Sequence, residues 1–532
     1  MAIKISGTTV IDDSRNVTDV ENVGDANTVY YGSGANLTGI QAGSSTFTAS
    51  GAISNGDTVI INSNGTVSAI AASGSSDPSA GSAVVFKDGK GFNPMSVYDP
   101  NTKKVIVAYI DSNSSGDGKA IVGTVSGDTI SFGSVITFET GGFIEELVIT
   151  YDTNSQRVVV FYQESGGNGG RARVGTVSGT SITFGSKQTI DQNVQDIAAC
   201  FDAAADRVVF AYMDKGDSDK GKIYTAETTS SRTLTNHQIT EFRNRKAAHN
   251  ALVYNPEVER CMVMWRDEGY SSRGQANVFE IDSNGSVTLL GGNQWHPTDT
   301  ASGYPAAVYD PDSDKIVISY KGTSSYGYGR VGTMTTNSIS WGTAVAYNSS
   351  LTYYNEIVYD SSERKVLTAY YTNHSVAPGK MVSGTVSGTS ITFSSIATWE
   401  SENKASNNFS DYPFGLSYDS EASKVVLTYY HGASSSSASG NETRAKVIST
   451  DGRTTNLTAN NYIGIAAEAI SSGSSGSITI AGGTNSSQSG LTTGRVFVNR
   501  TGDLETTSIG KPSVVGGTAI SSSSVIVKNT IV

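Results

Sequence analysis

The chain has 532 residues, a net charge of −12 at pH 7 and only 16% charged residues. Such a length exceeds one ordinary hydrophobic core, so several domains are expected. An acidic chain is poorly suited to the phosphate backbone, which argues against a nucleic-acid partner. No apolar stretch is long enough for a transmembrane helix, and residues 1–7 lack the basic and apolar regions of a signal peptide. We therefore expect synthesis in a cytoplasm, without membrane insertion.

The composition predicts an all-β protein. Glycine contributes 58 residues and tyrosine 26, whereas proline contributes only 10, and long runs of Ala, Leu, Glu and Lys are absent. This composition suits short strands joined by tight turns. The two cysteines, Cys200 and Cys261, are too few for a disulfide framework and are expected to be buried thiols. No histidines are paired at metal-ligand spacing, so we expect neither a metal site nor a cofactor.

A motif occurs seven times between Gly91 and Leu457. In each copy an aromatic residue precedes Asp or Asn, and an apolar run then ends in a second aromatic residue 11 positions after the first. The first aromatic residues of the copies are Tyr98, Tyr151, Phe201, Tyr254, Tyr309, Tyr359 and Tyr418. The steps between copies vary from 50 to 59 residues. A constant motif with variable steps indicates a repeat protein whose insertions fall in loops.

Each repeat contains four strand-like runs. The first ends at the aromatic residue and Asp, the second is the apolar run, and a Val-Gly-Thr-Val element with an alternating run supplies the third and fourth. Four antiparallel strands in a unit of this length are typical of a propeller blade, so residues 82–457 are predicted to form a seven-bladed β-propeller. A β-solenoid or a string of small sandwiches is the alternative, although solenoid coils are usually shorter and sandwiches longer. Ser82–Lys87 would complete the seventh blade beside Arg453–Leu457.

The segments on either side of the repeats are similar to each other. Gly56–Val67 and Gly494–Leu504 each predict a hairpin with a glycine turn. We expect residues 41–81 and 458–532 to form one small β domain, with the propeller inserted between its halves. Two separate small domains are the alternative.

Residues 1–40 differ from both predicted domains. Short apolar positions are scattered through a polar sequence rich in Asn and Asp, so this extended segment cannot bury much surface alone. We expect it to pack on another chain, and symmetric assembly is an economical way to achieve this.

Four stretches near the two ends carry a family resemblance. They are Met1–Asn16, Gly34–Ile40, Asn461–Ile470 and Gln488–Gly494. These stretches resemble segments of tail-fibre and related virion appendage proteins of marine bacteriophages, especially cyanophages. The resemblance implies a virion structural protein, a homotrimer whose residues 1–40 attach it to other tail or capsid proteins and whose distal β domains contact a host glycan or protein. A purely architectural capsid or tail decoration protein and a glycan depolymerase are the alternatives.

Acidic residues form no recognisable catalytic motif. The Asp after the first aromatic residue, such as Asp99, recurs in nearly every repeat, which favours a turn-forming role. Asp310–Asp314 alternates carboxylates as calcium loops do, but it lacks their glycine and distal glutamate. The Ser-x-Asp-x-Gly-x-x-Trp turns of propeller sialidases are absent, although a glycosidase needs only two well-placed carboxylates. We expect non-enzymatic binding and no catalytic residue.

Aromatic side chains in loops are the candidate binding residues, because Tyr and Trp can stack on sugar rings or anchor a protein contact. The candidates are Trp295, His296, Tyr326, Tyr328, Tyr353 and Tyr354. For the loop tyrosines, packing is the alternative of equal weight. Tyrosines that end the apolar runs, such as Tyr109 and Tyr162, are expected to pack between strands.

Deletion of residues 1–40 is expected to abolish incorporation into the particle and to leave the repeats folded, because this segment supplies attachment and no core. Immunoblots of purified particles measure incorporation, and circular dichroism of the purified variant checks its folding. Unchanged incorporation would contradict the attachment role.

Overall fold

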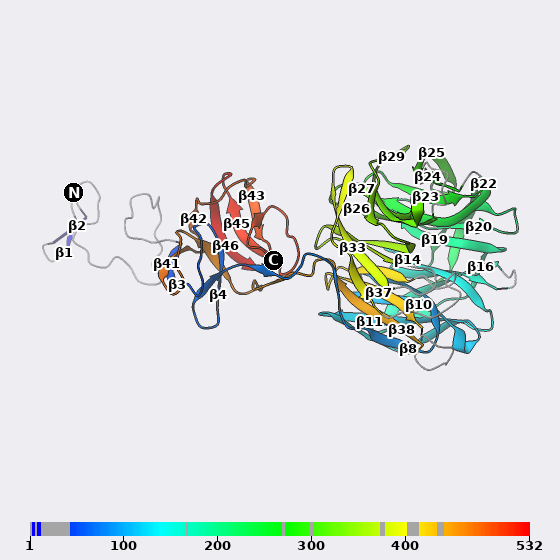
Figure 1. The fold of residues 1–532 in the computed structure, drawn as a ribbon, viewed down its shortest axis with the longest axis horizontal. Helices are drawn as coiled ribbons and strands as arrows, with labels where there is room; N and C mark the ends of the chain where they lie inside the picture. The colour runs from blue at the N-terminus through cyan, green and yellow to red at the C-terminus, as the bar shows by residue number, and fades with distance from the viewer. Residues whose placement is uncertain are drawn as a thin grey trace.

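The computed structural model describes residues 3–5, 8–11, 43–165, 169–268, 272–296, 303–372, 378–401, 414–432 and 441–531. Within these ranges almost every element is a β-strand, and the helical pieces are two 3-10 turns, η2 (Ser112–Ser114) and η3 (Thr323–Ser325). The strands form a small body, which contains both the first blue and the last red strands, and a larger ring of sheets (Figure 1). No helix in the described part of the chain is long and apolar enough to cross a membrane.

Most of the predicted attachment segment, residues 1–40, lies outside the described residues. The described part consists of β1 (Ile3–Ile5) and β2 (Thr8–Ile11), which pair in antiparallel order. The attachment role of this segment stays a prediction.

The ring is built from repeated antiparallel units, of which the first is representative. Strands β9 (Gly91–Asp99), β10 (Lys104–Asp111), β11 (Asp117–Ser126) and β12 (Thr129–Phe132) pair in sequence order. A fifth strand, β13 (Ile136–Glu139), lies on the same side of β11 as β12 does. β12 pairs with the end of β11, and β13 pairs with its beginning. The apolar run forms the second strand, and every residue of β10 except the first is buried. The four strands predicted for a repeat are confirmed in this unit. The apolar run is buried on both faces because the second unit packs on one face of the sheet and the last unit on the other.

The same order recurs around the ring. The second unit contains β14 (Ile144–Asp152), β15 (Arg157–Glu164), β16 (Gly169–Ser178), β17 (Ser181–Phe184) and β18 (Gln188–Asp191). A later unit contains β26 (Gly303–Asp310), β27 (Lys315–Lys321), β28 (Gly327–Met334), β29 (Ile339–Trp341) and β30 (Val345–Asn348). The unit after it contains β31 (Tyr353–Asp360), β32 (Lys365–Tyr371), β33 (Gly379–Ser387), β34 (Ser390–Phe393) and β35 (Ala397–Glu400). The last contains β36 (Gly415–Asp419), β37 (Lys424–His431) and β38 (Glu442–Ser449).

One long strand belongs to two units. The first part of β22 (Leu234–Asn255) pairs with β21 (Lys220–Thr228), and its second part pairs with β23 (Arg260–Asp267). The other strands of this seven-stranded sheet are β19 (Val194–Asp202), β20 (Arg207–Asp214), β24 (Arg273–Ile281) and β25 (Val287–His296). The outer strand of one unit therefore continues directly into the first strand of the next.

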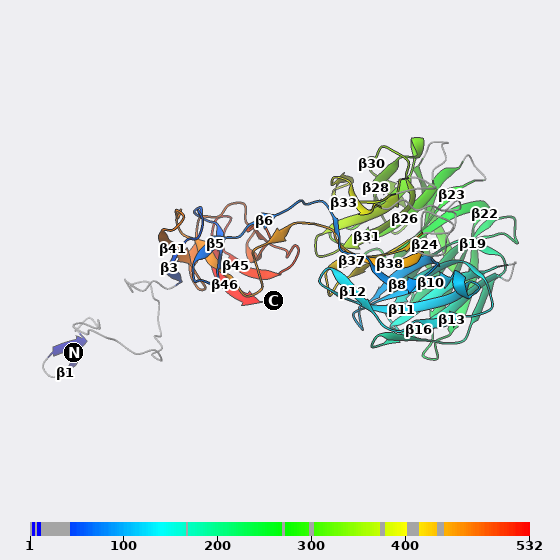
Figure 2. The ribbon, with the colours of Figure 1, turned by 60° about the horizontal axis from the view of Figure 1, so that its bottom comes forward.

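Strands from both ends of the repeat region close the ring. The first strands of successive units lie beside one another, and β36 lies beside β9. β7 (Ser79–Ala80) and β8 (Val84–Asp88) precede the first repeat but pair with β38 of the last unit (Figure 2). The predicted pairing with Arg453–Leu457 is wrong, because β39 (Thr454–Thr455) lies beyond β38 and pairs with β6 (Ala72–Ser73) in the connection to the small body.

The small body combines the two flanking segments. One sheet has the order β3-β41-β40-β4-β5 and therefore contains strands from before and after the ring. Its strands are β3 (Ser44–Thr48), β4 (Thr58–Ile61), β5 (Val67–Ala69), β40 (Tyr462–Ala466) and β41 (Ser475–Thr479). The second sheet contains β42 (Thr484–Asn485), β43 (Gly494–Val498), β44 (Leu504–Glu505), β45 (Val514–Ala519) and β46 (Val525–Ile531). Buried Ile60, Tyr462 and Val496 belong to a core shared by both sheets.

The Asp of the repeated motif shapes the turn that follows it. Asp152 is 2% exposed, and its carboxylate accepts hydrogen bonds from the backbone N–H groups of Asn154 and Ser155 at 3.0 and 2.9 Å. In the repeat that carries Asn instead, the Asn255 side-chain oxygen accepts from the N–H of Glu257 at 2.9 Å. The structural interpretation of these recurring side chains is confirmed by these bonds.

The aromatic residue of the motif contacts the preceding unit. The Tyr418 hydroxyl accepts a hydrogen bond from the N–H of Ser362 at 3.1 Å. The Tyr98 hydroxyl of the first unit accepts one from the N–H of Glu421 in the last unit at 3.4 Å. The same residue type therefore joins successive units and the two ends of the ring.

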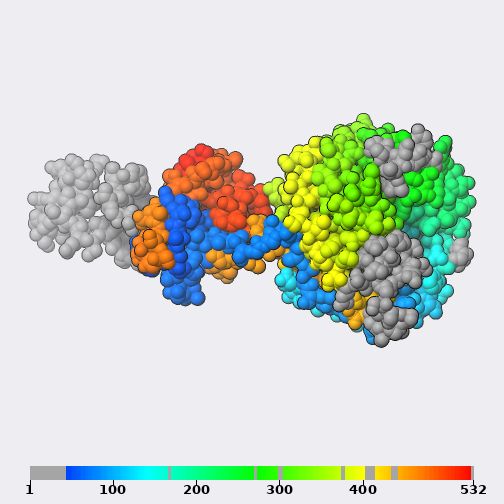
Figure 3. Space-filling view, in the orientation of Figure 1, coloured from blue at the N-terminus to red at the C-terminus, as the bar shows by residue number. Residues whose placement is uncertain are grey.

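An ionic cluster joins the small body to the ring. Arg500 of the small body is 9% exposed, and its guanidinium pairs with Glu363 and, at 3.3 Å, with Asp451. Lys365 and Arg453 contact the same Asp451 carboxylate at 3.0 and 2.7 Å. Burial raises the pKa of Asp451, but hydrogen bonds from Arg453 and Lys365 outweigh it and lower this pKa to about 2. The blue connecting segment lies at the narrow waist between the two bodies (Figure 3).

Substitution Asp152→Ala is expected to lower the free energy of unfolding by about 1–2 kcal/mol, because the turn loses its side-chain acceptor. Asp152→Asn is expected to cost less, since Asn255 performs the same function in a matching repeat. Chemical denaturation of the full chain measures both variants. Equal losses would contradict the role of the side-chain oxygen.

Candidate functional site

A pocket of about 780 Å³ lies where the first strands of the units converge. One repeat position, five residues before the first aromatic residue of the motif, supplies six of its lining residues. These are Asn93, Glu146, Asp196, His249, Tyr304 and Tyr354. The matching residue of the last repeat, Pro413, lies outside the described residues. We call this site the central pocket, and the position that dominates its lining differs chemically from unit to unit.

The backbone bulges at this position. The pairing register shifts between Gln195 and Ala198 in β19, and between Ala248 and Ala251 in β22. Five of the six residues, all except Glu146, have a left-handed backbone with φ between 46° and 52°. A side chain other than glycine in this region costs about 1–3 kcal/mol, and such strain concentrates at binding and catalytic sites.

Hydrogen bonds between neighbouring units hold the bulges in place. The Asn250 side-chain amide donates to the carbonyl oxygen of Asp196 at 2.8 Å, and that of Asn355 donates to the carbonyl oxygen of Tyr304 at 3.1 Å. Each bond crosses from one unit to the one before it. The wall of the central pocket is therefore built by the ring and cannot form in an isolated unit.

One side of the central pocket is acidic. Glu145, Glu146 and Asp196 line it, and the Glu146 carboxylate accepts a hydrogen bond from the N–H of Ile197 at 3.0 Å. Burial of the carboxyl and the negative charge of Asp196 raise the pKa of Glu146 to about 8. This side can therefore present a protonated carboxyl and a second acidic residue to one ligand.

Next to the acidic residues lies an aromatic group, whose His249 is 4.0 Å from the Asp196 carboxylate. The Tyr304 ring centroid lies 4.6 Å from that of His249 and 4.8 Å from that of Tyr354. The Lys321 ammonium lies over the Tyr353 ring, 4.3 Å from its centroid. Burial lowers the pKa of His249 and of Lys321, which favours their neutral forms relative to exposed side chains. A ligand in the central pocket could thus contact an apolar ring face and polar groups together.

Two predicted binding residues belong to this aromatic group. Tyr354 lines the central pocket, and Tyr353 lies beside it, with their ring centroids 6.4 Å apart. His296 and Tyr328 line a different pocket, of about 580 Å³. Tyr326 is half-exposed and lines neither pocket. The structure therefore does not bring the six predicted residues into one site.

The interpretation of Trp295 as an exposed loop residue is wrong. Its side chain is 0% exposed at the end of β25, and its Nε1 donates a hydrogen bond to the carbonyl oxygen of Gln275 at 2.8 Å. It lies over Gly274, where a Cβ atom would be 2.3 Å from the indole ring. Trp399 covers Gly379 in the same way. This packing belongs to the scaffold.

Sequence reasoning missed Glu146, Asp196, His249 and Tyr304. Each appears in the sequence as an ordinary polar or aromatic residue of a strand. Aligning the repeats on their first aromatic residue would have shown that this position differs in chemistry from copy to copy. The bulge, and the convergence of the six positions, needed the structure.

The carboxylates of Asp310–Asp314 have protein partners. Asp310 accepts the turn N–H of Asp312 at 3.0 Å, and Asp312 contacts Arg364 at 3.2 Å. Asp314 accepts from the Asn255 amide at 3.3 Å. In the part of the chain that the structure describes, no group of three or more His, Cys, Asp or Glu side chains could hold a metal ion.

The two cysteine sulfurs lie 3.9 Å apart, between adjacent units. Cys261 is buried, as expected, whereas Cys200 is half-buried. Burial raises the pKa of the Cys261 thiol, which keeps it protonated and poorly nucleophilic.

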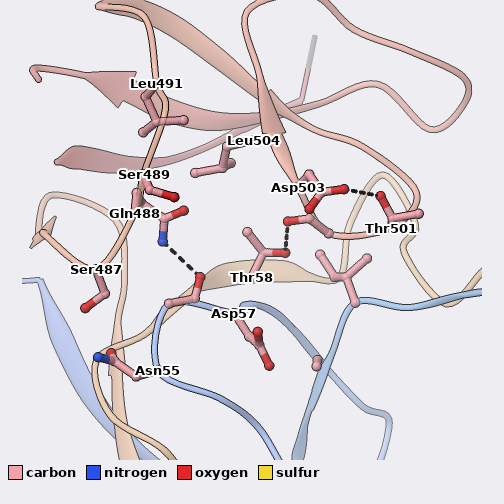
Figure 4. Close-up of a pocket in the computed structure, with 14 residues that line it drawn as sticks. Asn55, Asp57, Thr58, Ser487, Gln488, Ser489, Leu491, Thr501, Asp503 and Leu504 are labelled. Carbon is pink, nitrogen blue, oxygen red and sulfur yellow. Dashed lines mark hydrogen bonds between the residues drawn. The ribbon is translucent and has the colours of Figure 1, made fainter. Parts of the chain in front are cut away.

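The small body has a polar pocket of its own, of about 360 Å³, between its two sheets (Figure 4). Protein contacts engage its main side chains. The Gln488 amide donates to the carbonyl oxygen of Gly56 at 2.9 Å, and the Thr58 hydroxyl donates to that of Gly502 at 2.6 Å. These bonds join the segment before the ring to the segment after it, which indicates a structural role.

No protein-family model and no curated protein matches the chain. Among solved structures, a lectin from Burkholderia pseudomallei matches with a TM-score of 0.52 at 10% identity, over 69% of this chain and 98% of the lectin. The chain has a β-propeller-like fold. A protein from Lactobacillus plantarum (TM-score 0.44, 14% identity, 58% of this chain and 86% of that one) and an intramolecular trans-sialidase from Ruminococcus gnavus (0.40, 10%, 68% and 95%) match more weakly. At these identities the likeness concerns the fold alone.

Stability is expected to fall as pH rises from about 5 to about 8, in part because of Glu146. The folded chain keeps the Glu146 proton up to about pH 8, whereas the unfolded chain releases it near its ordinary pKa of about 4.3. Glu146→Gln, which cannot titrate, is expected to show a smaller fall. Denaturation of both chains at the two pH values measures the difference, and parallel losses would contradict the raised pKa.

Proposed function

We propose that this protein is a structural subunit of a bacteriophage particle, part of a tail fibre or related appendage, that attaches to the host surface by non-enzymatic binding. Its ring is a seven-bladed β-propeller, and its residues 1–40 attach it to other tail or capsid proteins as a homotrimer. The resemblance of the chain ends to phage virion proteins supports the virion role. The ring supplies the binding surface.

The observation that carries the binding role is the chemical variation at the central pocket. The turn-forming Asp and the buried second strands recur around the ring, whereas the pocket position varies among Asn, Glu, Asp, His and Tyr. Architecture alone does not explain strained backbone around a concave polar and aromatic pocket, but ligand binding does. Carboxylates that accept hydrogen bonds from hydroxyl groups, and ring faces that stack on sugar rings, suit a hydroxyl-rich ligand such as a surface glycan.

A glycan depolymerase is the second candidate, and one observation favours it. Glu146, a carboxyl with its pKa raised to about 8, lines the same pocket as Asp196. A protonated acid and a second carboxyl are the groups that glycosidases use. An architectural subunit is a third candidate, in which the face with the central pocket would be covered by a neighbouring virion protein.

Binding of the labelled full-length chain to a panel of marine cyanobacteria tests the proposal. Tyr304→Ala and Asp196→Asn are each expected to weaken binding about tenfold, because each removes a distinct part of the pocket lining. Val135→Ala is the control, since Val135 is 44% exposed and does not line the central pocket. Flow cytometry at several protein concentrations measures the affinity.

Two further measurements separate the candidates. Reducing ends released from host polysaccharide, and lost in Glu146→Gln, would replace the binding proposal with the depolymerase. An electron-microscopy map of the particle with the central pocket covered by another virion protein would replace it with the architectural role. Equal binding by the pocket variants and the control would also overturn it.

A further inference from the structure

A second pocket lies between β25 and the unit of β26–β30, and it has a volume of about 580 Å³. We call it the side pocket. Its lining includes His296, Thr323, Tyr328, Arg330, Trp341 and Ala344. It is formed where two units of the ring meet, away from the residues that line the central pocket.

The matching place between the first two units is filled by an ionic cluster. The Lys187 ammonium lies 3.1 Å from the Glu139 carboxylate and 2.8 Å from that of Glu164. Arg171 contacts Glu164 at 3.0 Å. Long charged side chains that neutralise one another therefore occupy this space.

Strand register identifies the counterpart of Glu139. In the first unit Glu139 lies opposite Gly118, and in the unit of β24 and β25 His296 lies opposite Gly274. His296 therefore replaces the carboxylate that anchors the ionic cluster. It is 6% exposed, and its ring centroid lies 5.5 Å from that of Tyr320.

Sequence position identifies two further counterparts. Glu164 and Gly322 each lie two residues after the tyrosine that ends the apolar run, and Lys187 and Ala344 each lie three residues after the aromatic residue of the fourth strand. A hydrogen atom and a methyl group thus replace two long charged side chains. The loss of these side chains explains why this interface is hollow.

Aromatic rings form part of the wall that remains. Tyr328 occupies the place of Arg171, each directly after a glycine of the third strand. Tyr328 is half-buried and stacks on Tyr320, with the centroids 5.8 Å apart and the rings inclined by 22°. Trp341 also lines the pocket. A ring face backed by a second buried ring is a preorganised surface for an apolar ligand face.

The polar groups of the side pocket include one cation, Arg330. Arg330 donates to the carbonyl oxygens of Gly342 and Trp295 at 2.6 and 2.8 Å, which fixes the position of its guanidinium in the wall. The hydroxyl-bearing Thr323 and Thr343 are exposed at the pocket. No carboxylate of the described residues lines it. The lining therefore disfavours a cationic ligand and offers donors and acceptors to hydroxyl groups.

We propose that the side pocket binds a neutral pyranose sugar, with the apolar face of the sugar ring on Tyr328 and Trp341 and its hydroxyl groups toward Arg330 and the threonines. A pyranose matches this combination because it presents C–H groups on its faces and hydroxyl groups around its edge. The inference is independent of the virion role and of the central pocket.

Titration of the full-length chain with methyl glycosides of glucose, galactose, mannose and N-acetylglucosamine tests the proposal by saturation-transfer NMR. At least one glycoside is expected to bind. Ala344→Lys is expected to weaken that binding about tenfold or more, because the longer side chain and a second positive charge beside Arg330 disturb the space that Ala344 leaves open. Tyr328→Ala is expected to weaken it similarly, and Tyr328→Phe to change it less than threefold, since the ring face remains.

Val135→Ala, at an exposed residue outside both pockets, is the matched control and is expected to leave methyl glycoside binding unchanged. Tyr304→Ala, in the central pocket, distinguishes binding there from binding at the side pocket. Thermal unfolding checks that each variant is folded. Absence of binding by all four glycosides would overturn the proposal. So would binding that Ala344→Lys leaves unchanged, or binding that only Tyr304→Ala removes.

Discussion

The ring depends on a pair of adjacent side chains that recurs along the chain. The Asp or Asn of the motif binds backbone N–H groups of its own turn, as Asp152 does. In several units the tyrosine before it accepts a hydrogen bond from the turn of the preceding unit, as Tyr418 does from Ser362. Local folding and ring assembly therefore depend on adjacent residues. A unit whose Asp forms the turn also presents the turn N–H groups that the tyrosine of the next unit contacts. The ring is closed by the pairing of β7 and β8 with β38.

A scaffold held in this way leaves other positions free to differ. The position five residues before the aromatic residue carries a bulge whose backbone cost is met by hydrogen bonds between units, such as that from Asn250 to Asp196. Because these bonds use backbone carbonyl groups, they do not dictate the side chain at the bulge. Glu146 and Tyr304 can therefore occupy equivalent places and give the central pocket an acidic and an aromatic side.

At the interfaces between units, too, some contacts recur while the side chains that fill the remaining space differ. Between the first two units Glu139, Glu164 and Lys187 form a cluster of ion pairs. At the side pocket the supporting contacts persist, since Arg330 binds backbone carbonyl groups of both units, but the space-filling charges are absent. The junction with the small body is the opposite case, because several cations converge on Asp451 there and leave little room for change.

The amino-acid sequence by itself determined the repeat unit. The motif spacing, the apolar second strand and the turn-forming Asp reflect interactions between residues that are close in the chain. Their pattern can therefore be recognised from the sequence alone. Interactions across the ring were decided by tertiary structure. The strand partner of β8 lies more than 300 residues away in β38, and the sequence suggested the wrong partner.

The same division holds for the candidate sites. Sequence reasoning selected Tyr354 and Tyr328 by residue type, but it also selected Trp295, which packs on Gly274 in the scaffold. It passed over Glu146 and Asp196, because a carboxylate in a strand has no distinguishing local pattern. Only ring closure brings these residues to one pocket, since each comes from a different unit and no short-range contact joins them.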